Sequence, residues 1–323
     1  QVSAGVKQAA NAPRDLLSMT AVLFALLPIA TLLALGKGVA LTQVLSKDGW
    51  LGLERITYFV LFPALIVGKL AVADFSGVDW RMPTVLVTAQ VSLAIVSIGV
   101  AFLLRTPKVR IGVYVQSAAR WNTFIALALG QELLGAQGVA LVAVAAAVMI
   151  PVANLVSVIA LMRFSGTAVK NTELARQLAI NPLVLACVIG IGLNFARIPL
   201  PAPALNILDL LAQATIALGL LTTGAAIQVK GRSAPFVSVL SWSLLRLLGM
   251  PLIAGILAFS LGVHAEILLV MMIATSVPTA SNGTILARQL GADANLAANL
   301  IATQTVLAIG TIAFVLWLMS SYI

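Results

Sequence analysis

Charged residues are scarce in this sequence: they make up 9% of its 323 residues, whereas hydrophobic residues make up 61%. A soluble globular domain carries about 25% charged residues, which keep its surface hydrated. The low charge and a mean hydropathy of +1.09 therefore exclude an ordinary soluble domain. Within a bilayer, only helices and closed barrels satisfy every backbone hydrogen bond. The long apolar runs lack the alternation of barrel strands, so the sequence predicts an all-α integral membrane protein.

Cysteine and histidine are almost absent, with Cys187 inside an apolar run and His264 as the single histidine. One cysteine cannot build a disulfide framework, and the sequence lacks the Cys and His clusters that hold zinc. The apolar runs also lack the nucleophile–base pairs that a membrane enzyme would need. We therefore expect no metal, no cofactor and no enzymatic activity.

Acidic residues are fewer than basic ones, 10 against 19 Lys and Arg, which gives a net charge of +9. No basic run is interleaved with aromatic residues, so nucleic acid is not an expected partner. The cations lie mainly in short links between apolar runs. This distribution is typical of the positive loops that membrane proteins keep in the cytoplasm.

Ten apolar runs have about the 20 residues that cross a bilayer. Residues 1–18 are expected to be an N-terminal extension, and residues 164–178 a cytoplasmic linker between two five-helix halves, 19–163 and 179–323. The predicted spans are 19–36, 55–73, 82–104, 111–133, 138–162, 179–197, 204–228, 234–261, 264–289 and 293–321.

The loop charges predict the orientation of these spans. Loops opposite the termini hold twelve of the 19 Lys and Arg residues, against five on the side of the termini. Both termini are therefore expected to be extracytoplasmic, in a cell inner or plasma membrane. Five spans per half would place the halves in opposite orientations, as in an inverted repeat. Pro28 and Gly36 in the first span match Pro182 and Gly190 in the sixth, with the same spacing.

The fourth and ninth spans are unusually polar, at Gln116–Thr123 and Thr275–Thr284. Pro278, in the ninth, removes a helical hydrogen bond and favours a break. Interrupted backbone at membrane depth occurs where it lines a cavity or is buried in protein. We therefore predict a substrate site here, although small polar residues also serve simply to pack helices closely.

Arg120 lies ten residues after Arg110, about 15 Å along a helix and so near the middle of the bilayer. A charged side chain there costs at least about 2.5 kcal/mol. It is expected either to bind a substrate carboxylate or to cap freed backbone carbonyls. For Arg246, in the eighth span, a structural role is expected. Two amide residues are expected to bond neighbouring helices, Asn154 and Gln304.

Asp209 and Gln213 are four residues apart in the seventh span, and therefore share one helix face. A carboxyl group at that depth can couple transport to protons, so this pair is a candidate coupling site. The alternative is that Asp209 stabilises the N-terminus of its helix.

An ordered set of motifs resembles the auxin efflux carrier family, which includes plant PIN proteins and bacterial carboxylate carriers. Pro278-Thr-Ala followed by Leu286-Ala resembles a family signature, and Arg120-Trp-Asn122-Thr resembles the polar region of the fourth span. Further matches are Asn181-Pro182, Leu208-Asp209, Thr223-Gly-Ala225 and Phe62-Pro-Ala-Leu65. More distantly, the chain resembles the sodium–bile acid symporters, whose acid-rich sodium sites it lacks.

The resemblance implies ten helices in two inverted five-helix repeats, with broken helices four and nine crossing at the centre, and often a homodimer. It implies that Asn122 and Asn282 contact the substrate and that Pro278 breaks the ninth helix. The family usually has a proline soon after the fourth-span asparagine, where Ala126-Leu-Ala128 stands here. A break in that span would then depend on Asn122 and Thr123 alone.

The leading hypothesis is a secondary active transporter that moves a small organic anion, such as malonate, malate or an auxin-like carboxylate, by alternating access. Alternatives are a sodium-coupled carrier like the bile acid symporters, or a channel or signalling scaffold. Expected partners are the anion, the lipid bilayer, a proton or sodium as coupling ion, and a second copy of the chain. The predicted substrate-binding residues are Arg120, Asn122, Thr123, Pro278, Thr279, Ser281 and Asn282.

Overall fold

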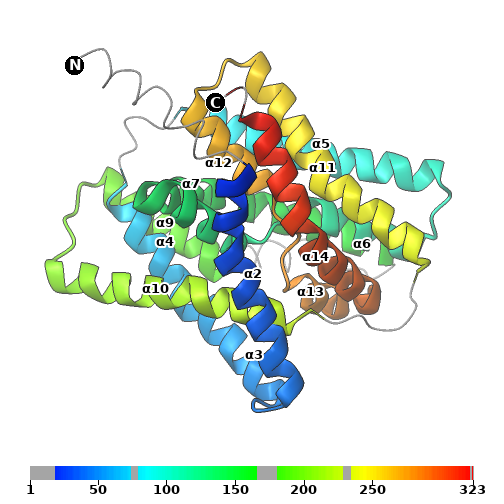
Figure 1. Ribbon diagram of the computed structural model, residues 1–323, viewed down its shortest axis with the longest axis horizontal. Coiled ribbons are helices and arrows are strands. Elements are labelled where there is room, and N and C mark those ends of the chain that lie inside the picture. The colour runs from blue at the N-terminus through cyan, green and yellow to red at the C-terminus, as the bar shows by residue number, and fades with distance from the viewer. Residues whose placement is uncertain (1–18, 74–78, 166–179, 228–233, 321, 323) are drawn as a thin grey trace.

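The structure, a computed structural model, describes residues 19–73, 79–165, 180–227, 234–320 and 322. Within these residues the chain forms helices joined by short turns (Figure 1). The predicted extension 1–18 and all but the first two residues of the predicted linker 164–178 lie outside the described residues.

The first half of the chain begins with α2, a 24-residue apolar helix, and ends with α7, which follows a non-helical segment after α6. A short π-helical turn, η1, joins α3 to α4. The turn within α7 lies at Gly135, whose φ of 61° is one that glycine adopts without strain. The elements are α2 (Met19–Thr42), α3 (Lys47–Ile56), η1 (Thr57–Leu61), α4 (Phe62–Ala71), α5 (Arg81–Leu103), α6 (Lys108–Ala119) and α7 (Thr123–Ser165).

The second half of the chain contains two short helices, α12 and α13, separated by a non-helical segment. Proline opens α9, where Asn181 caps the helix by accepting hydrogen bonds from Leu183 and Val184. The elements are α9 (Pro182–Phe195), α10 (Ala202–Ala225), α11 (Phe236–Ser260), α12 (Ala265–Ser276), α13 (Gly283–Gln289) and α14 (Ala294–Met319).

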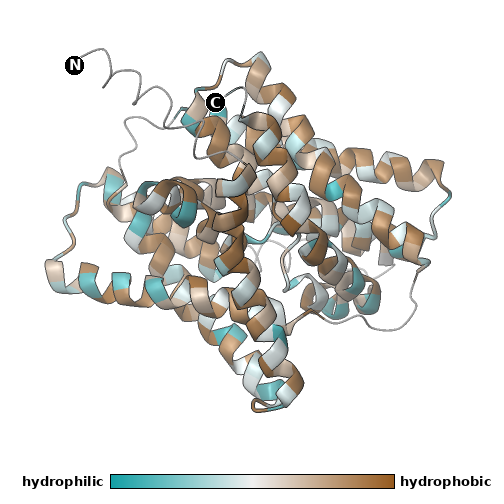
Figure 2. Cartoon of the chain, in the orientation of Figure 1, coloured by the Kyte–Doolittle hydropathy of each residue, from teal (hydrophilic) through white to brown (hydrophobic). Residues whose placement is uncertain are grey.

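Among the described residues, seven helical segments are long and apolar enough to cross a membrane, and α9 and α12 are shorter apolar helices. One of the seven, Lys108–Phe164, covers two predicted spans. Each of the ten predicted ranges overlaps a described helix. Figure 2 shows hydrophobic residues along most of α5, α11 and α14, whereas α10 carries several hydrophilic positions. The prediction of an all-α membrane protein is confirmed.

The second predicted span begins too late. It was expected at residue 55, but α3 begins at Lys47. The Ser46 side chain accepts a hydrogen bond from Gly49, 3.1 Å away, and Asp48 lies in the first turn. Both features stabilise a helix N-terminus, so the charged stretch is a helix rather than a loop. The first span also continues further than expected, to Thr42.

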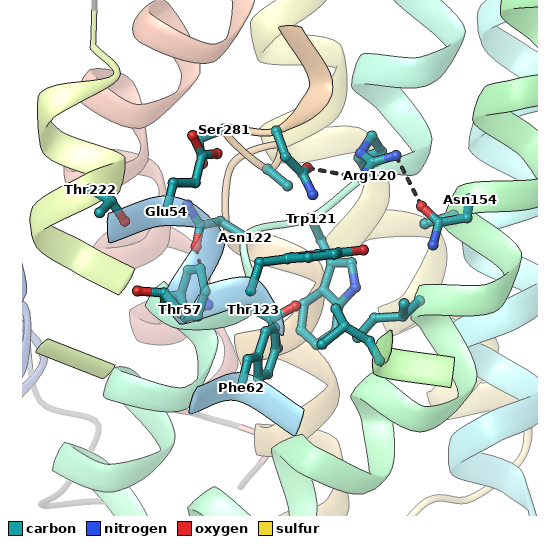
Figure 3. Close-up of a pocket in the computed structure, with 17 residues that line it drawn as sticks. Glu54, Thr57, Phe62, Arg120, Trp121, Asn122, Thr123, Asn154, Thr222 and Ser281 are labelled. Carbon is teal, nitrogen blue, oxygen red and sulfur yellow. Dashed lines mark hydrogen bonds between the residues drawn. The ribbon is translucent and has the colours of Figure 1, made fainter. Parts of the chain in front are cut away.

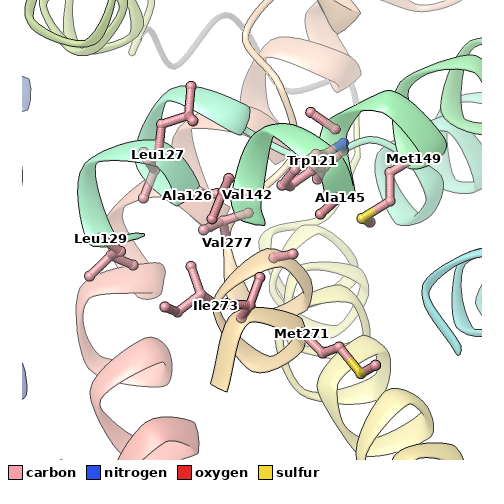
Figure 4. Packing of buried hydrophobic residues seen from close by; sticks show 14 of the residues in the cluster. Trp121, Ala126, Leu127, Leu129, Val142, Ala145, Met149, Met271, Ile273 and Val277 are labelled. Carbon is pink, nitrogen blue, oxygen red and sulfur yellow. The ribbon is translucent and has the colours of Figure 1, made fainter. Parts of the chain in front are cut away.

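The helices form two groups that pack most extensively among themselves. We call α2, α3, η1, α4, α9 and α10 the framework helices, and α5, α6, α7, α11, α12, α13 and α14 the crossing helices. In Figure 1, α4, α9 and α10 lie on the left, whereas α5, α6 and α11 lie on the right. Within the crossing helices, buried apolar side chains of α7 and α12 pack together, including Leu127, Val142 and Ile273 (Figure 4).

Candidate functional site

The fourth span is interrupted at Arg120–Asn122. Helix α6 ends at Ala119, Arg120 is extended with φ −80° and ψ 155°, and α7 begins at Thr123. The side-chain Oδ1 of Asn122 accepts hydrogen bonds from the N–H groups of Phe124, at 3.1 Å, and Ile125, at 3.2 Å. Asn122 therefore caps α7, which explains how this span breaks without the proline that the family usually has.

The ninth span is also interrupted. Helix α12 ends at Ser276, Val277 is extended with φ −69° and ψ 152°, and α13 begins at Gly283. The helices that precede the two interruptions, α6 and α12, are both 12 residues long. The two halves of the chain thus place a break at the same distance from the start of a helix.

The two interruptions contact each other. The N–H of Asn122 donates to the carbonyl of Pro278 at 2.7 Å. Gln304, on α14, accepts from the N–H of Thr279 at 2.9 Å and donates to the hydroxyl of Ser117 at 2.6 Å. Backbone groups that the breaks remove from helices therefore find partners inside the protein, as buried polar groups must. Gln304 bonds neighbouring segments, as predicted.

Arg246 supports the crossing from α11. Its side chain is fully buried, its Nε donates to the carbonyl of Arg120 at 3.2 Å, and its Nη1 donates to the carbonyl of Thr275 at 2.6 Å. These carbonyls lie at the C-terminal ends of α6 and α12, where a helix attracts positive charge. Arg246 therefore has the structural role expected from the sequence.

Arg120 is bound differently. Its guanidinium donates from Nη1 to Oδ1 of Asn154 at 3.1 Å and from Nη2 to Oδ1 of Asn282 at 2.8 Å (Figure 3). Its Nε is buried without a hydrogen-bond partner, and the residue is 7% exposed. Both partners are neutral amides, which orient the guanidinium but leave its charge uncompensated. Arg120 forms no ion pair with any described residue.

Two adjoining cavities, of about 60 and about 490 Å³, lie beside this arginine. The narrow one is lined by the interruptions and by framework residues such as Thr222, and the lining of the wide one includes Arg55 and Arg288. The larger volume falls in the usual range of ligand sites. The cavities lie between the framework helices and the crossing helices, and both are lined by Glu54, Tyr58, Arg120, Asn154 and Asn282.

The structure brings five of the seven predicted substrate-binding residues to the cavities, namely Arg120, Asn122, Thr123, Ser281 and Asn282. Pro278 and Thr279 are buried at the contact between the interruptions and do not line either cavity.

The predicted coupling pair lies elsewhere. Asp209 forms an ion pair with Lys69 at 3.1 Å, its side chain is 57% exposed, and Gln213 is also exposed. Neither residue lines a cavity. Asp209 also lies beyond the first turn of α10, which begins at Ala202, so the alternative of N-terminal stabilisation has no support from the geometry.

Sequence reasoning missed Glu54 and Tyr58, which line both cavities from α3 and η1. The usable signal was the capping serine, Ser46, followed by Asp48, which marks a helix start and makes Glu54 part of a helix. Thr57–Leu61 forms a π-helical turn, a feature frequent at functional sites.

Residues 166–316 match the family model of a membrane transport protein. The second half of the chain is thus similar to this family. The match confirms the resemblance to auxin efflux carriers that the sequence motifs indicated. The matched segment includes Ser281 and Asn282, whereas Arg120 lies outside it. No curated protein matches the chain.

Proposed function

We propose that this protein is a secondary active transporter that carries a small organic anion, such as malonate, malate or an auxin-like carboxylate. The observation that carries the proposal is the uncompensated guanidinium of Arg120, which two asparagines hold at the point where two interrupted helices meet. An arginine fork matches the geometry of a carboxylate and cannot lose its charge.

The surroundings of Arg120 support an anionic ligand. Trp121 follows Arg120 in the narrow cavity, and its indole N–H, like Nε of Arg120, is buried without an acceptor among the described residues. Buried donors normally have acceptors, and an anion supplies them. In the wide cavity, Arg55 and Arg288 add two further cations. Positive charge along a cleft raises the local concentration of anions.

The repeated interruptions support an inverted-repeat carrier. Helices α5 and α11 each direct one buried polar side chain at the end of a broken helix: Gln90 donates to the carbonyl of Ala119 at 2.7 Å, and Arg246 donates to that of Thr275. We infer that the halves 19–163 and 179–323 are inverted five-helix repeats whose broken helices cross at the site.

The position of the cavities between two helix groups supports alternating access. Movement of the crossing helices against the framework helices would open the site to one side of the membrane and then to the other. We further propose a cell inner membrane location, extracytoplasmic termini, a homodimer and coupling to a proton or sodium.

The test is binding and uptake of labelled malonate, malate and a monocarboxylate by purified protein in proteoliposomes. Arg120→Met is expected to weaken binding by at least about tenfold, since a hydrogen bond to a charged group contributes roughly 1.5–3 kcal/mol. Arg120→Lys, which keeps the charge but loses the fork, should bind weakly. Arg163→Met, at the exposed end of α7, is the matched control.

Carboxylate binding that is equally strong in Arg120→Met and in the wild type would contradict the proposed site. Ionic current without saturation, in place of carrier-like saturable uptake, would favour a channel.

A further inference from the structure

Glu54 is the one acidic residue among the described residues that line the two cavities. It is half-buried near the end of α3. Figure 3 shows its side chain reaching from α3 into the pocket on the side of Ser281. A carboxylate in a site of this kind competes with, or repels, a carboxylate ligand.

The Glu54 carboxylate forms no hydrogen bond or ion pair with a described residue. Arg120, which lines the same cavities, donates to two amides instead. Glu54 lies in the candidate membrane span Lys47–Ala71, where a structural acid would be expected to have a partner, since intramembrane ionisable residues normally pair. The lack of one indicates that Glu54 acts on what enters the cavity.

The other titratable and charged groups around Glu54 do not replace it. Arg55, Arg120 and Arg288 share its cavities and stay protonated, and Tyr58 accepts a hydrogen bond from Asn181 at 3.2 Å. Lys47 and Asp48 lie at the opposite, exposed end of α3. Helix α10, which packs against α3, carries Asp209, already paired with Lys69, and Lys37 of α2 donates to the carbonyl of Ile227.

We propose that Glu54 makes anion binding proton-linked: the cavity accepts a carboxylate when Glu54 is protonated and disfavours it when Glu54 is charged. This inference rests on the proposed function and names its coupling ion, the proton, and the residue that carries it. It replaces the pair Asp209 and Gln213, which lies outside the cavities.

The linkage has a definite sign. Binding of a carboxylate to deprotonated protein is accompanied by uptake of one proton, which leaves hydronium or a buffer acid as its bond to that donor breaks and an O–H bond forms on Glu54. Anion binding and proton binding therefore favour each other. The affinity for the anion falls as pH rises through the titration of Glu54, by at most about tenfold per pH unit for one linked proton. A carrier with this property moves a proton together with its anion.

Calorimetric titration of malonate into the wild type tests this linkage, when it is repeated over a range of pH and in buffers of different ionisation enthalpy. The measurement gives both the affinity and the number of protons taken up. Protons from malonate and buffer are common to all variants, so the difference between the wild type and Glu54→Gln isolates Glu54. The wild type should take up as much as one proton more than Glu54→Gln, whose affinity should vary less with pH.

Two controls accompany this comparison. Glu54→Asp keeps a titratable carboxyl and should retain proton uptake, whereas Asp48→Asn, on the exposed part of the same helix, should behave as the wild type. If Glu54→Gln does not fold, infrared spectra of the wild type and of Glu54→Asp are compared in place of the calorimetric titrations. Added malonate should then produce a protonated-carboxyl band whose frequency shifts between the two proteins.

Equal proton uptake and equal pH dependence in the wild type and Glu54→Gln would overturn this inference. If Arg120→Met still lost malonate binding in that case, the proposed anion transport would be retained without a role for Glu54 in proton coupling. Binding of no carboxylate at any pH would overturn both. Absence of a protonated-carboxyl band on malonate binding would also overturn the role of Glu54.

Discussion

At the scale of single residues, two buried arginines show how partners decide function. Arg246 donates to backbone carbonyls at the ends of two helices, whereas Arg120 donates to two side-chain amides beside a cavity. The first arrangement neutralises helix ends, and the second leaves a cation facing the cavity. The sequence places both arginines inside apolar runs, but the partners that distinguish them come from distant parts of the chain.

Arg246→Met should destabilise the protein although Arg246 does not line the cavities. The substitution leaves two buried carbonyls without a donor, and each unsatisfied group costs about 1–3 kcal/mol. We expect a lower melting temperature in detergent and weaker malonate binding, both partly restored in Arg246→Lys. An unchanged melting temperature would show that the crossing does not depend on these two bonds.

Asn122 was predicted to contact the substrate, and in the structure its side chain caps α7. Serine also caps helices well, whereas alanine costs about 1 kcal/mol. If capping is its main role, Asn122→Ser should keep the melting temperature and malonate affinity of the wild type, and Asn122→Ala should lose both. Loss of affinity at unchanged stability in Asn122→Ser would instead support direct substrate contact. Fluorescence-monitored unfolding and binding titrations distinguish the two outcomes.

At the scale of helices, close backbone contacts hold the framework together. A Cβ added at Gly36 of α2 would overlap the carbonyl oxygen of Leu221, and one at Gly224 of α10 would overlap that of Leu33. This reciprocal arrangement lets α2 and α10 approach closely, as small residues do in membrane helix pairs.

Gly36→Ala should therefore destabilise the pair of helices α2 and α10, because the methyl group meets backbone that cannot rotate away. Overpacking of this kind costs about 1–3 kcal/mol. Gly38→Ala, two residues further along α2, has nothing within 4 Å of the added Cβ and is the matched control. The measurement is the melting temperature of both variants. Equal values would mean that this close approach contributes little to stability.

At the scale of the whole molecule, the charged residues that line the wide cavity predict which side of the membrane it faces. The wide cavity is lined by Arg55 and Arg288, in the last turns of α3 and α13, and the distribution of positive charge predicts that both face the cytoplasm. We therefore expect the conformation described by this structure to be open toward the cytoplasm.

A cysteine at Ile285, which lines the wide cavity and is 38% exposed, should react with a membrane-impermeant thiol reagent from the cytoplasmic side. Ile198→Cys, beyond the opposite end of α9, should react from the outside. Both variants are made with Cys187, which is buried, replaced by alanine. Malonate should slow labelling at position 285 and leave position 198 unchanged. The reverse sidedness would contradict the assigned orientation.

The sequence by itself determined that this is a helical membrane protein and where its helices break. Hydropathy indicates the membrane and the helices, and proline, glycine and asparagine affect the backbone within a few residues of their own positions. The sequence also predicted most of the residues at the crossing. Tertiary structure decided which of these residues face a cavity. Arg120 and Asn282 are 162 positions apart, yet their side chains lie 2.8 Å from each other.

Glu54 shows the same limit most clearly. Its helix start could be recognised from Ser46 and Asp48, but its place beside Arg120 depends on how the framework helices pack against the crossing helices. Likewise, Asp209 is a carboxylate inside a predicted span, as a coupling residue would be, but packing places it at the surface beside Lys69. Local patterns set the backbone, whereas the partners of a charge depend on contacts between segments that the chain brings together only when it folds.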